Sequence, residues 1–370
     1  MLEFQAILVY LCYVRRFILA FILMILVVLT GCRSQIQQGD NPVAMEHDVL
    51  AANAPDYAER YTSALVLLPE GETLPMSEFR EIWVYVIDGE EEYLKPGLPI
   101  SDIGYFGAEL DTYGKLVNVP DPRKIAFFGA RVHLVVASSS RSLTHFALLE
   151  GRPERRELIA DLLEAAKSYD GIQIDFENVA QRDADSFLAF LRDLRAGLNG
   201  KMLTIALPAR TRFIQNDIFD YAKINGHVDR ILVMAYDEHW SGSEPGPIAS
   251  MEWCRRVAAY SLEVIGREKL IMGLPFYGRT WGDINANRAF FNSGIERIKR
   301  EEGVTVVERD NGVPFFSYQK TLTVTGYYDD DYSLSTRLQM YRRMGVNAAG
   351  FWRLGQETPV IWPLLRFSVE

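Results

Sequence analysis

The segment from residue 170 to 177, Asp-Gly-Ile-Gln-Ile-Asp-Phe-Glu, alternates polar and apolar side chains over most of its length. Because every second side chain of an extended strand points to the same side, Gln173, Asp175 and Glu177 share one face. Two carboxyl groups on one face repel each other when both are ionised, so their pKa values separate and one keeps its proton near neutral pH. A proton donor beside a carboxylate is suited to the cleavage of glycosidic bonds.

The spacing of these two acids restricts the mechanism. Asp175 and Glu177 are two residues apart on one strand, too close to flank a sugar from opposite sides, so neither standard two-carboxylate geometry fits. The nucleophile must then come from elsewhere. The structural alternative is an exposed strand whose acids face water. A parallel strand of a barrel has no solvated face, which favours the functional interpretation.

The elements that position this strand are predicted from the alternation of short β-rich runs with helical patterns. The segments at 153–167 and 183–198 carry apolar residues at spacings of three and four, which is typical of amphipathic helices. Strands separated by helices predict parallel β-α-β units, and eight units match an α/β fold, the (β/α)8 TIM barrel. No glycine-rich phosphate loop follows any run, which argues against the alternative, a doubly wound open sheet. The eight β-rich runs are 81–87, 102–106, 131–137, 171–176, 202–207, 230–235, 269–274 and 347–352.

One stretch, from about 280 to 332, breaks the alternation. It carries a helix-like run and three β-like runs, and so predicts a small α+β insertion between strands seven and eight. The barrel with this insertion is expected to occupy residues 78–370. The preceding residues, 32–77, are polar and are predicted to be a tether.

The N-terminus has the pattern of a targeting segment. Two arginines precede an uninterrupted apolar run at 17–29, and the residues at 29–32 are Leu-Thr-Gly-Cys. This resembles a bacterial lipobox, which implies a signal peptide at 1–31, a lipidated Cys32 and a lipid-anchored protein in the bacterial cell envelope, facing outside the cytoplasm. The alternative is an uncleaved transmembrane anchor. Either one leaves the rest of the chain outside the cytoplasm.

Composition excludes some partners. The 39 Lys and Arg residues stand against 49 Asp and Glu, and a net charge of -10 repels phosphate backbones, so we expect no nucleic-acid partner. The 3 cysteines are too few and too scattered for a disulfide framework or a zinc site, and we expect no metal. We expect a monomer.

Four motifs in chain order carry a resemblance to a known family. Residues 170–177 resemble the strand-four signature Asp-x-x-Asp-x-Asp-x-Glu of family 18 glycoside hydrolases, the chitinase family. Met-Ala-Tyr-Asp at 234–237, Gly-Leu-Pro-Phe-Tyr-Gly-Arg at 273–279 and Gly-Phe-Trp at 350–352 are similar to its motifs on strands six, seven and eight. The match extends from about residue 80 to 355.

The resemblance implies retention of configuration with help from the substrate, the exception to the two-carboxylate scheme. Glu177 would protonate the leaving oxygen while the carbonyl oxygen of the substrate's 2-acetamido group attacks the anomeric carbon. Asp175 would orient that acetamide, and the Tyr236 hydroxyl would bind the attacking oxygen. Asp237 would hold the same sugar, and Trp352 would form the floor under its ring. No cofactor is implied.

Tyr277 and Arg279 are weaker candidates for substrate binding, because Arg279 could instead pair with a surface acid. Gln173 departs from the family, since most chitinases have aspartate there. We predict that its amide donates a hydrogen bond to ionised Asp175. Asparagine is common at this position in the branch that resembles bacterial spore cortex-lytic N-acetylglucosaminidases, and this branch is the most similar in its motifs.

These observations favour a glycoside hydrolase that cleaves β-1,4-linked N-acetylglucosamine in peptidoglycan or in chitin-type oligosaccharides. The alternative is a glycan-binding, lectin-like barrel without hydrolytic activity, an interpretation that the glutamine at 173 keeps open. A purely structural lipoprotein would have no reason to carry these groups at a barrel mouth.

Overall fold

The computed structural model describes residues 57–283, 288–319, 321 and 323–368. The predicted signal peptide and Cys32 lie outside the described residues. Within the described ranges, no helix combines the length and the apolar run that are needed to cross a membrane.

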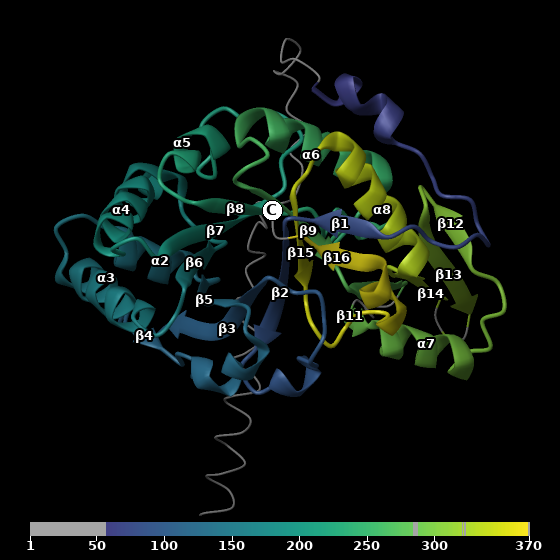
Figure 1. Ribbon diagram of the computed structural model, residues 1–370, viewed down its shortest axis with the longest axis horizontal. Coiled ribbons are helices and arrows are strands. Elements are labelled where there is room, and N and C mark those ends of the chain that lie inside the picture. The colour runs from purple at the N-terminus through teal and green to yellow at the C-terminus, as the bar shows by residue number, and fades with distance from the viewer. Residues whose placement is uncertain (1–56, 284–287, 320, 322, 369–370) are drawn as a thin grey trace, which may run out of the picture. The chain divides into compact units, whose positions relative to one another are not determined.

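Eight parallel strands form a closed barrel (Figure 1). Each strand pairs with the next one along the chain, and the last pairs with the first to close the sheet. All eight predicted runs coincide with these strands to within a few residues, and the predicted fold class is confirmed. The barrel strands are β2 (Glu81–Ile87), β3 (Asp102–Leu110), β5 (Arg131–Ser138), β6 (Gly171–Phe176), β7 (Met202–Pro208), β8 (Arg230–Met234), β9 (Leu270–Pro275) and β15 (Ala348–Trp352).

Helices cover the outside of the barrel after its third strand. They are α2 (Arg141–Leu148), α3 (Pro153–Ala166), α4 (Ala184–Gly197), α5 (Tyr221–Asn225), α6 (Met251–Val264) and α8 (Asp331–Met344). Helix α8 shows how the sequence determines where a helix begins and ends. Asp330 and Ser333 form a capping box at its start, and Gly345 takes the left-handed conformation at its end, with φ 86°.

The first two connections of the barrel contain no α-helix. Between β2 and β3 there is only the 3-10 turn η2 (Glu91–Tyr93). Between β3 and β5 lie β4 (Leu116–Val117) and the short turns η3 (Pro122–Lys124) and η4 (Ala126–Phe128). Glycine and proline interrupt both connections, so neither can form a long helix.

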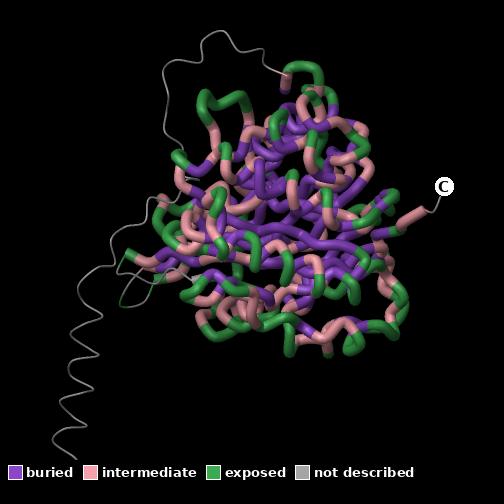
Figure 2. Tube along the Cα trace, turned by 90° about the vertical axis from the view of Figure 1, so that its left-hand side faces the viewer, coloured by how far each residue is buried: buried purple, intermediate pink, exposed green. Residues whose placement is uncertain are grey.

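The core has two layers. One lies inside the barrel, where the inward side chains of neighbouring strands, among them Trp83, Leu232 and Ile271, pack together. The other lies between the strands and the helices. Figure 2 shows the buried strands running through the middle of the domain. The domain therefore holds the ends of its strands on a rigid frame.

The insertion follows β9. Its elements are β10 (Tyr277–Gly282), β11 (Arg288–Phe291), α7 (Asn292–Glu301), β12 (Glu308–Asp310), β13 (Val313–Gln319) and β14 (Thr323–Tyr327). The strands form an antiparallel sheet in the order β11-β10-β14-β13-β12. The insertion starts at Tyr277, a little before the predicted limit, because β10 begins almost directly after the barrel strand.

Part of the predicted tether lies against the barrel domain. The 3-10 helix η1 (Tyr57–Ala64) contacts α6 and α8, where Arg255 and Arg343 donate hydrogen bonds to backbone carbonyls of η1. Further on, β1 (Ser77–Phe79) pairs in parallel with β16 (Leu365–Phe367), which follows η6 (Pro359–Leu364). Ala58 and Ala64 of η1 are also buried against the core. A segment this short is too brief to show such docking as an apolar period in the sequence.

Candidate active site

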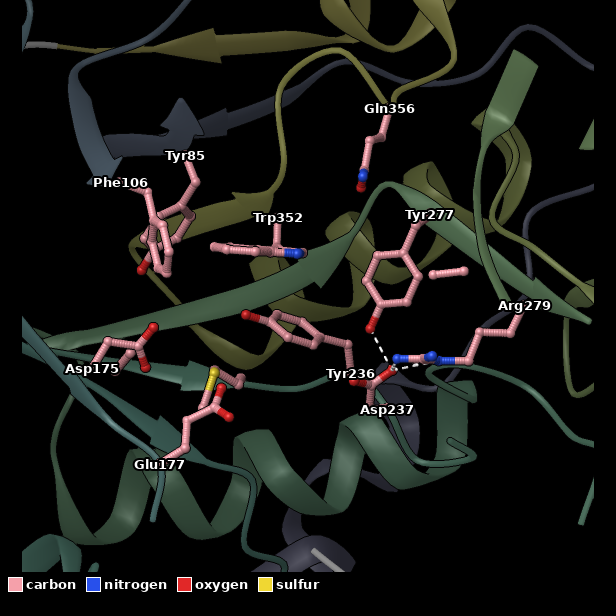
Figure 3. A pocket seen from close by; sticks show the side chains of 13 residues that line it. Tyr85, Phe106, Asp175, Glu177, Tyr236, Asp237, Tyr277, Arg279, Trp352 and Gln356 are labelled. Carbon is pink, nitrogen blue, oxygen red and sulfur yellow. Dashed lines mark hydrogen bonds and ion pairs between the residues drawn. The ribbon is translucent and has the colours of Figure 1, made fainter. Parts of the chain in front are cut away.

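A cleft opens at the C-terminal ends of the barrel strands (Figure 3). It brings together seven of the eight residues that the sequence predicted for catalysis and substrate binding: Asp175, Glu177, Tyr236, Asp237, Tyr277, Arg279 and Trp352. The eighth, Gln173, is fully buried inside the barrel and does not line the cleft. Six further lining residues were not predicted as site residues: Tyr85, Phe106, Ala206, Met234, Ala289 and Gln356.

Strand β6 carries the acid pair as the alternation predicted. Its apolar side chains pack outward, and the Phe176 ring lies 5.9 Å from the Phe190 ring of α4. Asp175 lines the cleft from the other face of the strand and is only 7% exposed. Glu177 is the first residue beyond the strand and remains exposed to solvent.

The electrostatics of the pair follow from burial and proximity. Asp175 Oδ1 is buried and accepts no hydrogen bond from the described residues. Burial, and then the charge of Glu177, raise the pKa of Asp175 to about 8. The walls of the cleft, and then the charge of Asp237, raise the pKa of Glu177 as well. In the free protein near neutral pH the pair therefore retains a proton.

The predicted hydrogen bond from Gln173 to Asp175 is wrong. The Tyr85 hydroxyl donates to Gln173 Oε1, and Gln173 Nε2 donates to Thr204 Oγ1 at 3.2 Å. The register of β6 and β7 places Gln173 beside Thr204, and Tyr85 comes from β2. The Oε1 and Nε2 atoms of Gln173 are thus both hydrogen-bonded inside the barrel, to Tyr85 and Thr204, and not to Asp175.

Asp237 is the centre of a second polar group. Its Oδ1 accepts hydrogen bonds from the Tyr277 hydroxyl at 2.5 Å, from Arg279 Nε at 2.9 Å and from Arg279 Nη2 at 2.7 Å. Asp237 itself has φ 59°, in the left-handed region that residues other than glycine seldom adopt. Arg279 therefore pairs with an acid of the cleft, and the alternative of a surface acid is wrong.

Aromatic rings form the remaining wall. The Trp352 indole, at the end of β15, lies 5.2 Å from the Tyr85 ring and 5.3 Å from the Phe106 ring. Tyr236 packs edge to face against Tyr277, with the ring centroids 6.2 Å apart. Aromatic faces of this kind bind the C–H faces of sugar rings. Across the described parts of the chain, no group of three or more His, Cys, Asp or Glu could hold a metal ion.

The unpredicted lining residues gave little signal in the sequence. Strand β2 is apolar at almost every position, so alternation could not show that Tyr85 points inward. Gln356 lies in an irregular loop after β15, where no periodicity exists.

A closed parallel barrel with an acid pair at the end of its fourth strand and an aromatic wall from its eighth defines a glycoside hydrolase of the barrel type. The sequence profile of the Glycosyl hydrolases family 18 matches residues 108–357, and the chain belongs to this family. The predicted family and enzyme class are confirmed.

Individual relatives share a quarter to a third of the aligned residues with this chain. The chain is 32% identical over 263 residues to the putative sporulation-specific glycosylase YdhD of Bacillus subtilis, which covers 66% of this chain and 61% of that protein. It is 25% identical over 288 residues to the cortical fragment-lytic enzyme of Bacillus anthracis, which covers 71% of this chain and 66% of that protein. The chain thus spans just under two thirds of the length of both relatives.

Solved structures agree with the fold. The crystal structure of YdhD from Bacillus subtilis matches with a TM-score of 0.62 and 28% identity, over 68% of this chain and 90% of that one. The Bacillus cereus spore cortex-lytic enzyme SleL matches with a TM-score of 0.71 over 81% of this chain and 77% of that one. The identity to SleL is 21%, so this likeness concerns the fold alone.

Proposed function

We propose that this protein is a retaining, substrate-assisted glycoside hydrolase that cleaves β-1,4-linked N-acetylglucosamine. The observation that carries the proposal is the state of the three carboxyl groups of the cleft. Asp175 lies on β6 and Glu177 follows directly after its end, so in this proposal they approach a bound sugar from the same side. Asp237, the third, is held by Arg279 and Tyr277. The proposal therefore assigns the part of the nucleophile to none of the three.

The substrate's own acetamido group fills that role in the proposal. Glu177 donates its proton to the glycosidic oxygen as the bond to the anomeric carbon breaks. The acetamido carbonyl oxygen, which accepts a hydrogen bond from the Tyr236 hydroxyl, bonds to that carbon and forms an oxazolinium ion. Water then attacks the anomeric carbon, and Glu177 takes up the proton that the water loses.

The shared proton of the acid pair gives Asp175 its part. In the free protein, burial raises the pKa of Asp175 and so favours its protonated form, whereas a positive oxazolinium favours its ionised form. We infer that substrate binding moves this proton toward Glu177, which delivers it to the leaving group. The carboxylate left on Asp175 then stabilises the cation.

Among glycans that contain N-acetylglucosamine, we favour peptidoglycan over chitin-type oligosaccharides. The names of the Bacillus relatives refer to sporulation and to cortical fragments, which supports a wall glycan. A lipid anchor at Cys32, as the lipobox resemblance suggests, would place the enzyme in the bacterial cell envelope, where peptidoglycan is the first glycan that it meets. We propose that it acts there as a monomer.

The test is hydrolysis of fluorogenic glycosides of N,N'-diacetylchitobiose and of the trisaccharide by the full chain and by Glu177→Gln. We expect the variant to lose about 10²-fold or more in kcat/KM, because it cannot protonate the leaving group. The first product should be the β-anomer by NMR. If the unmodified chain hydrolyses the glycosides and the variant does not, muropeptide digests then decide between wall glycan and chitin. Binding without hydrolysis by the unmodified chain would favour the lectin-like alternative.

A further inference from the structure

The Gln356 side chain points into the cleft with an unused amide oxygen. It follows Trp352 by four residues and approaches the cleft from the loop after β15 (Figure 3). The residue is only 8% exposed. Its Oε1 is buried and accepts no hydrogen bond from any residue that the structure describes.

The loop fixes the backbone position from which this side chain extends. The Gln356 backbone N–H donates to the Arg353 carbonyl at 3.2 Å, and its carbonyl accepts from the backbone N–H of Asn292, in the insertion, at 3.1 Å. The preceding Gly355 has φ 87°, and a Cβ at that position would lie 2.5 Å from the Tyr93 ring. The backbone that carries the side chain is therefore held from the barrel side and from the insertion side.

A buried amide oxygen without a partner weakens folding, because it loses its hydrogen bonds to water. A methionine would fill the same space without this loss. Of the lining residues, Asp175 and Gln356 are the two with a buried and unpartnered side-chain oxygen, within the described part of the chain. Asp175 has a role in the reaction, which leaves Gln356 as the polar group to be explained.

We propose that Gln356 is a substrate-binding and specificity-determining residue, whose Oε1 accepts a hydrogen bond from a ring hydroxyl of the sugar that packs on Trp352. The inference rests on the proposed function. Asp175 and Tyr236 serve the acetamido group in that mechanism, so the donor that remains on the sugar is a hydroxyl. The rest of the ring lies against the aromatic wall.

This contact gives the cleft a basis for discrimination. A sugar whose hydroxyl has been replaced by hydrogen, or blocked as an ether or ester, leaves Oε1 unpaired in the complex as well. Such a sugar should bind more weakly even where it fits the space. An uncharged acceptor also suits an uncharged hydroxyl, so the preferred ring is unsubstituted at the position that Gln356 contacts.

The experiment compares the unmodified full chain with Gln356→Met, a variant of similar volume that has no hydrogen-bonding amide. The control is Gln339→Met, the same change on helix α8, where Gln339 Nε2 donates to the Met76 carbonyl at 2.9 Å and is not a lining residue of the cleft. Substrates are the fluorogenic chitobioside and its analogues with the 3- or 6-hydroxyl of the reacting sugar replaced by hydrogen, since O4 of that sugar is in the bond to its neighbour.

We expect Gln356→Met to raise KM about 5- to 10-fold with kcat nearly unchanged, and to keep the melting temperature or raise it. One deoxy analogue should show the same increase in KM with the unmodified chain and no further increase with Gln356→Met. The control should leave KM unchanged. A KM unaffected by Gln356→Met, or equal increases in KM on both analogues for the unmodified chain and the variant, would overturn the inference.

These outcomes are separable from failure of the proposed function. The proposed function fails, and this inference with it, if the unmodified chain does not hydrolyse the chitobioside and the Glu177→Gln variant does not bind chitotetraose. If hydrolysis or binding is observed and Gln356→Met behaves like the unmodified chain, only the role of Gln356 is refuted.

Discussion

The Tyr85 hydroxyl donates a hydrogen bond to the Gln173 amide across the interior of the barrel, two residues before Asp175 on the same strand face. Gln173 therefore does not share a proton with Asp175, as an aspartate at this position could. The Gln173 side chain links its own strand, β6, to β2 through Tyr85 and to β7 through Thr204. The proton of the acid pair is left to Asp175 and Glu177 alone.

Removal of this link should destabilise the barrel in a cooperative way. Gln173→Leu leaves the buried Tyr85 hydroxyl without an acceptor, and we expect a loss of about 1–3 kcal/mol in the free energy of unfolding, measured with urea. In the Gln173→Leu/Tyr85→Phe double variant neither group is left unpaired. Its loss should therefore be smaller than the sum of the single losses. Strictly additive losses would show that the contact contributes nothing to stability.

Asp175 should make stability fall as the pH rises. Its pKa of about 8 in the folded protein lies above the value of about 4 for an unfolded aspartate, so the folded state binds more protons between these limits. The free energy of unfolding should thus decrease from pH 4 to pH 8 because of this group. Asp175→Asn cannot lose the proton, and the difference in stability between variant and unmodified chain should grow in favour of the variant across that range. A constant difference would contradict the raised pKa.

Asp237 and Arg279 should have opposite effects on the proton donor. The charge of Asp237 contributes to the raised pKa of Glu177, so Asp237→Asn should lower that pKa. Arg279→Met leaves Asp237 unneutralised and should raise it. We expect the alkaline limb of the pH dependence of kcat/KM to move by roughly half a unit to one unit, downward in the first variant and upward in the second.

Both variants also lose contacts in the cleft, and their maximal rates should fall about 10-fold or more. The position of the limb is therefore the measurement, and the rate is not. Movement of the limb in the same direction for both variants would show that Asp237 and Arg279 act on Glu177 only through the shape of the cleft.

The sequence allowed the barrel to be predicted because buried parallel strands appear as short apolar runs, such as 131–137 and 230–235, between amphipathic helices. The acid pair could be predicted because strand alternation places Asp175 and Glu177 on one face. Local patterns determine both features.

The partners of Gln173 could not be predicted in this way. Tyr85 is 88 positions away along the chain and lies in an apolar run, where inward and outward side chains are alike. Gln356 is positioned by the insertion through Asn292, and a loop without periodicity does not show that contact. The contacts between distant segments depend on how the barrel closes, which no local pattern encodes.

A buried ion pair holds the loop that carries Asp237. Arg337 of α8 and Asp329 have fully buried side chains, and Arg337 Nη2 lies 3.0 Å from Asp329 Oδ1. The same nitrogen donates to the Ala249 carbonyl at 2.5 Å, at the end of the loop between β8 and α6. Arg337→Met leaves the Asp329 carboxylate buried and unpaired by a cation, and it frees the Ala249 carbonyl. We expect a loss of about 3–5 kcal/mol in the free energy of unfolding.

The matched variant is Arg337→Met combined with Asp329→Leu, which removes both charges. Because an uncharged pair of similar volume has no buried carboxylate to compensate, it should be more stable than Arg337→Met alone. Urea unfolding measures both. The double variant still lacks the donor for Ala249, so its kcat/KM should stay below that of the unmodified chain even where its stability recovers. A double variant less stable than Arg337→Met would mean that Asp329 stabilises the fold through Ser333, to which it is hydrogen-bonded at 2.7 Å, and not through the ion pair.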